Sequence, residues 1–191
     1  MAEIRPFDGT MTSAEERRDF LELLSLAPSA RCLELSTHPH DAAEASFDAV
    51  LCIDGIAALR DRGAVLADWA RIVKPGGRIL YTDPAIVAGL VTNEELSLRG
   101  SMGGVVFSCQ GENESLIDAV GLRLKRADDA TEAAASVASR RHALRCSREP
   151  ELLAEEGRDL FDARQRFLEV SHRLAAERRL ARIVFLCEKA P

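Results

Sequence analysis

The 191-residue sequence has no surplus of basic residues, no internal repeat and no low-complexity segment. Its 25 Lys and Arg residues stand against 31 Asp and Glu residues, which gives a formal net charge of −6. Proteins that neutralise nucleic-acid phosphates need an excess of Lys and Arg, so this balance argues against a nucleic-acid partner. The arginine pairs at 140–141 and 178–179 have acidic residues nearby, which is typical of solvated helix faces.

A long apolar run is also missing. No stretch reaches the roughly 18 apolar residues expected of a transmembrane helix. The first twenty residues are too charged for a signal peptide. We therefore expect no membrane partner and a cytoplasmic location.

Cysteine and histidine are too scattered to indicate a metal or redox centre. The five cysteines are an odd number and form no C-x-x-C pair. Cys32, Cys52 and Cys187 lie in apolar runs, where cysteine behaves as a small hydrophobic residue. His38 and His40 flank a proline but have no evident third ligand. We predict reduced thiols and no metal site.

Hydrophobic patterns alternate between strands and helices along the chain. After an N-terminal helix that begins with capping boxes at Thr12 and Ser13, we expect strands at 31–35, 48–53, 78–82, 122–125 and 182–188. Helices are expected at 61–73, 94–99, 112–120, 131–147 and 150–179, the last with a possible kink near Gly157. The segment Lys74-Pro-Gly-Gly77 predicts a tight turn, and Asp83-Pro84 predicts the end of a strand. This order predicts a layered α/β domain with a largely parallel sheet.

Two segments carry a family resemblance. SFDAVLCIDGIAAL (46–59) resembles the fourth strand of class I S-adenosylmethionine (SAM)-dependent methyltransferases, and LADWARIVKPGGRILYTDP (66–84) resembles their next helix, Pro-Gly-Gly turn and fifth strand. Segments at 91–95, 111–114, 156–157 and 165–168 resemble the substrate-side parts of the small-molecule enzymes. The resemblance implies a truncated Rossmann-like sheet, mostly parallel with a C-terminal antiparallel strand and helices on both faces. It also implies one domain over 1–191, divided into a mobile arm (1–11), a core-sheet remnant (12–84), a substrate-side insertion (85–120) and C-terminal helices and strands (121–191).

The resemblance fails in the half of the fold that holds the cofactor. In the family, the first strand ends in an acidic residue and a glycine-rich turn that lets the backbone approach SAM. Here Glu34 is either a relic of that acidic position or an ordinary charge at the strand edge, and Ser36-Thr-His-Pro-His40 contains no glycine. Only the twelve residues 36–47 remain where the family has three crossovers, although Asp41 is a possible remnant. We therefore expect no SAM binding by this chain alone, and SAM only if a partner completes the site.

The resemblance also nominates residues on the substrate side. Asp54 matches the acid that ends the fourth strand, and Ala58 stands where related enzymes often carry a histidine able to act as a base. Asp83 either lines a substrate pocket or caps a turn. The remaining pocket candidates, which a structural role would explain equally, are Glu95, Arg99, Asn113 and Glu114. We assign no catalytic residue.

Three functions remain open at this point. The first is a non-catalytic accessory subunit, a pseudoenzyme in a heteromer with a related full-length methyltransferase or with a second copy of itself. A sheet that begins at the 31–35 strand would have an edge that invites such a partner, unless the 36–47 loop and the N-terminal helix cover it. The second is a SAM-dependent enzyme acting on a small molecule, with a rebuilt or partner-completed cofactor site, and the third is a truncated fragment of such an enzyme. Whether the chain is an enzyme is left undecided.

Overall fold

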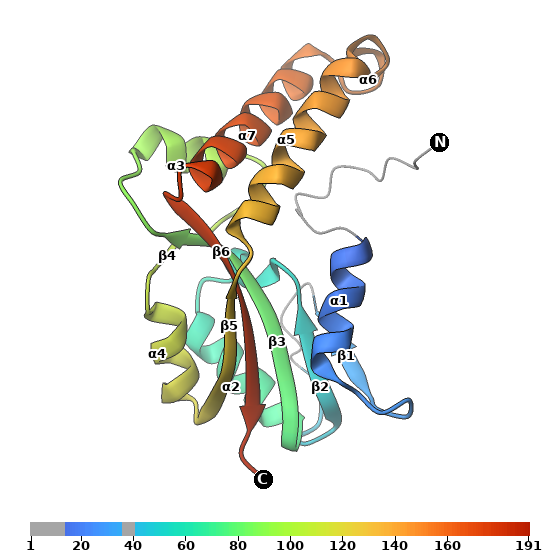
Figure 1. Cartoon of the computed structure of the whole chain (residues 1–191), viewed down its shortest axis with the longest axis vertical. Coiled ribbons are helices and arrows are strands. Elements are labelled where there is room, and N and C mark those ends of the chain that lie inside the picture. The colour runs from blue at the N-terminus through green and yellow to red at the C-terminus, as the bar shows by residue number, and fades with distance from the viewer. Residues whose placement is uncertain (1–13, 36–40) are drawn as a thin grey trace.

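A mixed β-sheet forms the centre of the protein, seen here in a computed structural model that describes residues 14–35 and 41–191 (Figure 1). Its strands are β1 (Cys32–Glu34), β2 (Phe47–Cys52), β3 (Val73–Val87), β4 (Ser108–Cys109), β5 (Leu122–Asp129) and β6 (Leu180–Lys189). The order across the sheet is β1-β2-β3-β6-β5, with β4 beside the end of β3. Strand β6 is antiparallel to both β3 and β5, whereas β1, β2, β3 and β4 pair in parallel. The predicted α/β class and antiparallel C-terminal strand are confirmed.

Helices cover both faces of the sheet. They are α1 (Ala14–Leu24), α2 (Arg62–Ile72), α3 (Asn93–Arg99), α4 (Glu112–Ala119), α5 (Thr131–Ser147), α6 (Glu149–Glu156) and α7 (Arg158–Ala176), with a 3-10 turn, η1 (Gly55–Ala58). Helix α1 packs Phe20 and Leu24 on one face. Helices α2 and α4 cover the other through Trp69 and Ile117. Helices α5 and α7 pack together and extend beyond one end of the sheet (Figure 1).

Alternate residues of the same strands supply the two hydrophobic clusters on opposite faces of the sheet. Val50 and Ile79 belong to the cluster under α2, whereas their chain neighbours Leu51 and Leu80 belong to the cluster under α1. Successive strand side chains point to opposite faces, so an uninterrupted apolar strand can supply both cores at once. Among the described residues, no helix is both long and apolar enough to cross a bilayer.

Strand β3 is longer than the sequence predicts. The predicted end at Asp83-Pro84 is wrong, because β3 passes through it with a register shift: Asp83 pairs with Ile183 but Ile86 with Ala181. Proline lacks an N–H, so a bulge tolerates it better than a regular ladder does. The 122–125 strand likewise continues to Asp129, and the 150–179 helix is divided at Gly157 into α6 and α7.

The first two strands lie side by side. Leu33 of β1 pairs with Val50 of β2, and the described part of their connection, residues 41–46, contains turns and no strand. Within 14–35 and 41–191, β1 pairs with no strand other than β2. The expected arm (1–11), the capping residues Thr12 and Ser13, and the His38–His40 pair lie outside the described residues.

The Pro-Gly-Gly segment requires both of its glycines for different reasons. At this segment Phe47 of β2 pairs with Val73 of β3, whereas Ala49 pairs with Arg78. An advance of two residues along β2 thus corresponds to five along β3, so the additional β3 residues bulge from the ladder. Gly76 has φ of +73°, and a Cβ on Gly77 would lie 2.8 Å from the Asp48 carbonyl oxygen and 2.5 Å from a Val73 methyl. Because real Cβ atoms do not approach backbone oxygen so closely, this close approach needs glycine.

We predict that Gly77→Ala lowers the free energy of unfolding by about 2 kcal/mol, since the added methyl group must displace strand backbone. Urea denaturation followed by circular dichroism measures this. Gly103→Ala is the matched control, because Gly103 has open space around its Cβ position. Equal stability of the two variants would contradict the close approach.

Candidate functional site

The ends of β2 and β3 are the place to search for a site, because open α/β sheets bind ligands outside the carboxyl ends of their parallel strands. Asp54 follows β2, and Thr82 and Asp83 lie in the neighbouring part of β3. Helix α3 and the α5–α7 hairpin lie beyond this end of the sheet (Figure 1).

Asp54 is enclosed by the chain's own polar groups. It adopts a left-handed conformation with φ of 57° at the start of η1. Its Oδ1 accepts hydrogen bonds from Thr82 Oγ1 at 2.6 Å and from Arg182 Nε at 2.8 Å. Arg182 is almost fully buried and also forms an ion pair with Glu16 of α1. The acid that ends β2 is therefore held between β3, β6 and a helix, and 7% of its side chain is exposed.

Asp83 is the centre of a second, fully buried cluster. Its Oδ2 forms an ion pair with Arg62 of α2 and accepts hydrogen bonds from Ser108 Oγ and Asn113 Nδ2, both at 2.8 Å. Its Oδ1 accepts from the Ala85 N–H at 3.0 Å. Burial without partners would be costly for this carboxylate, and these donors compensate its charge. The cluster is arranged to hold α2, β4 and α4 against β3.

Glu95 joins α3 to the end of the α5–α7 hairpin. It completes a capping box with Thr92. Arg179 contacts both of its carboxylate oxygens, at 2.8 and 2.9 Å, and Arg173 lies 3.3 Å from Oε1. Hydrogen bonds from Arg179 and from the Thr92 backbone lower the pKa of Glu95 to about 2.

The other predicted site residues are separated from these clusters. Arg99 packs over the ring of Phe167 with 5.3 Å to the ring centroid, and Glu114 is exposed on α4. Glu34 pairs with Arg17 of α1, with Arg17 Nε 2.8 Å from Oε1, and both side chains are about half exposed. Their contact lowers the pKa of Glu34. The structure thus brings Asp83 and Asn113 together but leaves Glu95 and Arg99 unpaired with each other, and the assignment of a substrate pocket stays a prediction.

Sequence reasoning missed the arginines that hold these acids. Arg62 and Arg182 are each almost fully buried. Arg182 interrupts an otherwise apolar strand, and such a position indicates a cation with a buried partner. Arg62 gives no comparable signal, because an arginine in the first turn of a helix is normally exposed.

Comparisons with known proteins agree with this fold. Residues 8–81 match the methyltransferase domain family, and no curated protein matches. A cyclopropane synthase from Mycobacterium tuberculosis superposes with a TM-score of 0.79 at 14% identity, covering 97% of this chain and 87% of that one. Phosphoethanolamine N-methyltransferase 2 from Haemonchus contortus, solved with phosphomonomethylethanolamine and S-adenosylhomocysteine, gives 0.70 at 16% identity over 79% of this chain. Geranyl diphosphate C-methyltransferase from Streptomyces coelicolor superposes with a TM-score of 0.58 at 11% identity over 81% of this chain.

The protein has the Rossmann-like fold of class I SAM-dependent methyltransferases, and the predicted resemblance is confirmed. The chain spans 35% of the Haemonchus enzyme and 51% of the Streptomyces enzyme. At these identities the likeness establishes the fold alone.

We predict that Arg62→Met lowers the free energy of unfolding by about 3–5 kcal/mol, because it leaves the Asp83 carboxylate buried without its cation. Chemical denaturation provides the measurement. Arg158→Met removes an exposed arginine, paired with Glu149, and should cost less than about 1 kcal/mol. A loss at Arg62 no larger than at Arg158 would refute the stabilising role of the cluster.

Glu95 should make stability depend on pH. Its pKa is about 2 in the folded protein against an ordinary value of 4.5, so its contribution is present above pH 4.5 and is lost as the pH falls towards 2. We therefore expect the difference in melting temperature between wild type and Glu95→Gln to be largest near neutral pH and to shrink below pH 4.5. Glu94→Gln, at an exposed position on the same helix, should show no such trend. A pH-independent difference at Glu95 would contradict the ion pair with Arg179.

Proposed function

We propose that this protein is a non-catalytic subunit with a methyltransferase fold, which supports a complete methyltransferase. The single observation behind the proposal is the state of Asp54. In related enzymes the acid at the end of this strand lies beside the substrate, whereas here Arg182 and Thr82 already occupy its carboxylate. Removing that carboxylate would leave the buried Arg182 without one of its two acidic partners, which is costly.

The residues on the cofactor side also fit SAM poorly. Glu34, the relic of the acid on the first strand, is bonded to Arg17 of α1. The segment that follows contains no glycine, and the described connection from β1 to β2 contains no strand that could supply a second acid for the ribose. These features support the expectation that the chain by itself does not hold SAM.

The partner in this proposal is a related full-length methyltransferase or a second copy of the chain. Its docking edge would be β1, which has only three residues and, in the described chain, one neighbouring strand. Unpaired backbone groups at the edge of a sheet are a template for another chain.

A second candidate is a SAM-dependent enzyme for small molecules whose cofactor site is completed by the partner. The observation in its favour is the fold itself, because the Haemonchus neighbour was solved with S-adenosylhomocysteine. The two candidates differ in whether this chain contributes groups to the reaction.

Titration calorimetry of the isolated chain with SAM tests the proposal, combined with light scattering of the same sample at about 10 μM. We expect no saturable heat and a self-associated species, or a complex when a related full-length methyltransferase is added. Micromolar SAM binding by the isolated chain would overturn the non-catalytic assignment. A monodisperse monomer that forms no complex and binds no hydrophobic dye would overturn the partner model.

A further inference from the structure

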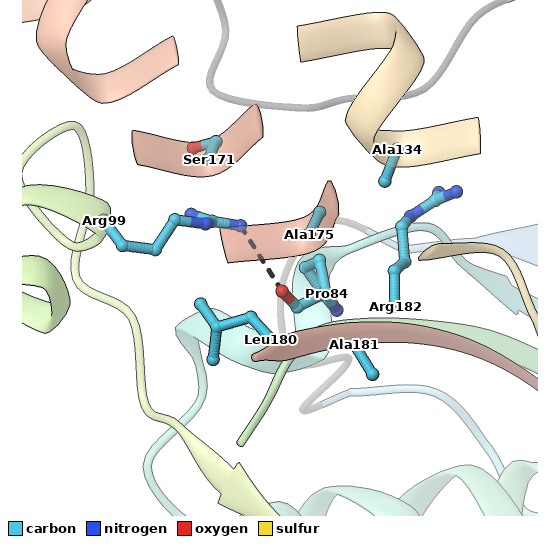
Figure 2. A pocket seen from close by; sticks show the side chains of 8 residues that line it. All are labelled: Pro84, Arg99, Ala134, Ser171, Ala175, Leu180, Ala181 and Arg182. Carbon is cyan, nitrogen blue, oxygen red and sulfur yellow. Dashed lines mark hydrogen bonds between the residues drawn. The ribbon is translucent and has the colours of Figure 1, made fainter. Parts of the chain in front are cut away.

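A small cavity lies between the α5–α7 hairpin and the end of the sheet. Its volume is about 20 Å³, and Figure 2 shows the groups around it. Arg99 of α3 and Arg182 of β6 approach it from opposite sides, and Ser171 of α7 lies above. The remaining wall is small and apolar, and includes Pro84, Ala134 and Ala175.

Arg99 is a buried cation with weak partners. It is 8% exposed, and its hydrogen bond within the described chain runs from Nη2 to the Pro84 carbonyl oxygen at 3.5 Å, longer than a normal hydrogen bond (dashed line, Figure 2). The face of Phe167 provides a further contact. No carboxylate of the described residues lies within ion-pair distance. Burial lowers the pKa of Arg99, but a guanidinium remains charged in proteins, so the site keeps its positive charge.

The acidic side chains nearest to Arg99 form ion pairs with other arginines. Asp54 and Asp83 act on Arg99 only from a distance. Asp54 contacts Arg182, and Asp83 contacts Arg62. On the neighbouring side of α3, Arg173 and Arg179 both contact Glu95, and Arg179 also pairs with Glu177. Arg99 is therefore the buried arginine at this corner that has no carboxylate of its own among the described residues.

Ser171 adds a hydrogen-bond donor without an acceptor. Its side chain is buried, and its Oγ has no hydrogen-bond partner among the described residues. Buried hydroxyl groups in native proteins nearly always have a partner, so one that lacks it at a cavity indicates a bound group. Ser171 and Arg99 come from different helices and line the same cavity.

We propose that this cavity binds one small monovalent anion, with Arg99 as its counter-ion and Ser171 Oγ as a hydrogen-bond donor. A space of about 20 Å³ admits roughly one water-sized group. A halide ion, or one oxygen of the carboxylate group of a small ligand, fits that size, whereas a whole sulfonate or phosphate group does not. Arg182 lines the opposite wall but is already paired with Asp54 and Glu16, so Arg99 is the cation assigned to the anion. The site needs neither SAM nor a partner, so it is independent of the function proposed above.

Thermal unfolding in different sodium salts tests the site, with ionic strength held constant by methanesulfonate. Bromide and formate represent the two sources of the anion. An anion that binds only the folded state stabilises it in a saturable way, and we expect a rise in melting temperature of roughly 5–10 °C at a hundredfold excess over Kd. A rise with both salts supports a general small-anion site, and a rise with formate alone assigns a carboxylate. No saturable rise over methanesulfonate with either salt would overturn the proposal.

Three variants locate the effect. Arg99→Met should abolish the salt-specific rise, and Ser171→Ala, which removes only one hydroxyl group, should reduce it by at least half. Arg166→Met is the matched control, because Arg166 lies on α7, is exposed and carries the same charge. If Arg99→Met does not fold, Ser171→Ala decides the outcome. An unchanged rise in Ser171→Ala would overturn the assigned cavity.

Discussion

The carboxylate of Asp83 is fully buried at a point where four segments of the chain meet. Arg62 reaches it from α2, Ser108 from β4 and Asn113 from α4, and the Ala85 N–H closes it from the bulge of its own strand. A buried charge tolerates little freedom in its surroundings, because each missing donor leaves a desolvated oxygen. The same cluster therefore fixes the bulge of β3, the start of the substrate-side insertion and the helix that covers one face of the sheet. Asp54 and Glu95 repeat the principle at smaller scale, each held by arginine from a distant part of the chain.

Much of the secondary structure could be predicted because its signals are local. The apolar run at 48–53 and the periodic stripe at 61–73 differ by only a residue or so from β2 and α2, and residues 131–147 match α5 at both ends. The course of β3 beyond Pro84 could not be predicted, since it depends on pairing with β6 about a hundred residues later. The candidate site could be predicted only in part, for the same reason. A family resemblance can nominate Asp83 and Asn113, but no local sequence pattern connects them to Arg62 or Ser108. Arg182 was also missed, although a cation within the mostly apolar strand β6 is a local signal that could have indicated a buried partner.

The two ends of this site differ in whether their charged and polar groups have partners within the chain. At the strand ends, each acid expected to face a ligand is bonded to arginine within the chain, so this part resembles the interior of a protein more than a receptor for a cofactor. Next to the hairpin the situation is reversed, because a buried guanidinium and a serine hydroxyl lack adequate acceptors. Under the two proposals, the architecture of the fold is kept while the binding site lies at a different wall. In the proposed function, SAM binding depends on another chain. The proposed anion site requires no other chain.

Strand β6 lies between β3 and β5, and this order constrains how the protein forms during translation. The residues of β3 leave the ribosome long before those of β6. Leu80, for example, cannot pair until its partner Leu186 has been synthesised. At about 5–20 residues per second, that interval is on the order of 5–20 seconds. Throughout it, one side of β3 lacks its neighbour in the finished sheet, and so does the whole of β5 once its residues have been synthesised. The nascent chain therefore carries unpaired strand edges for seconds, a period in which chaperones or another copy emerging nearby can reach them before the strand that completes the sheet does.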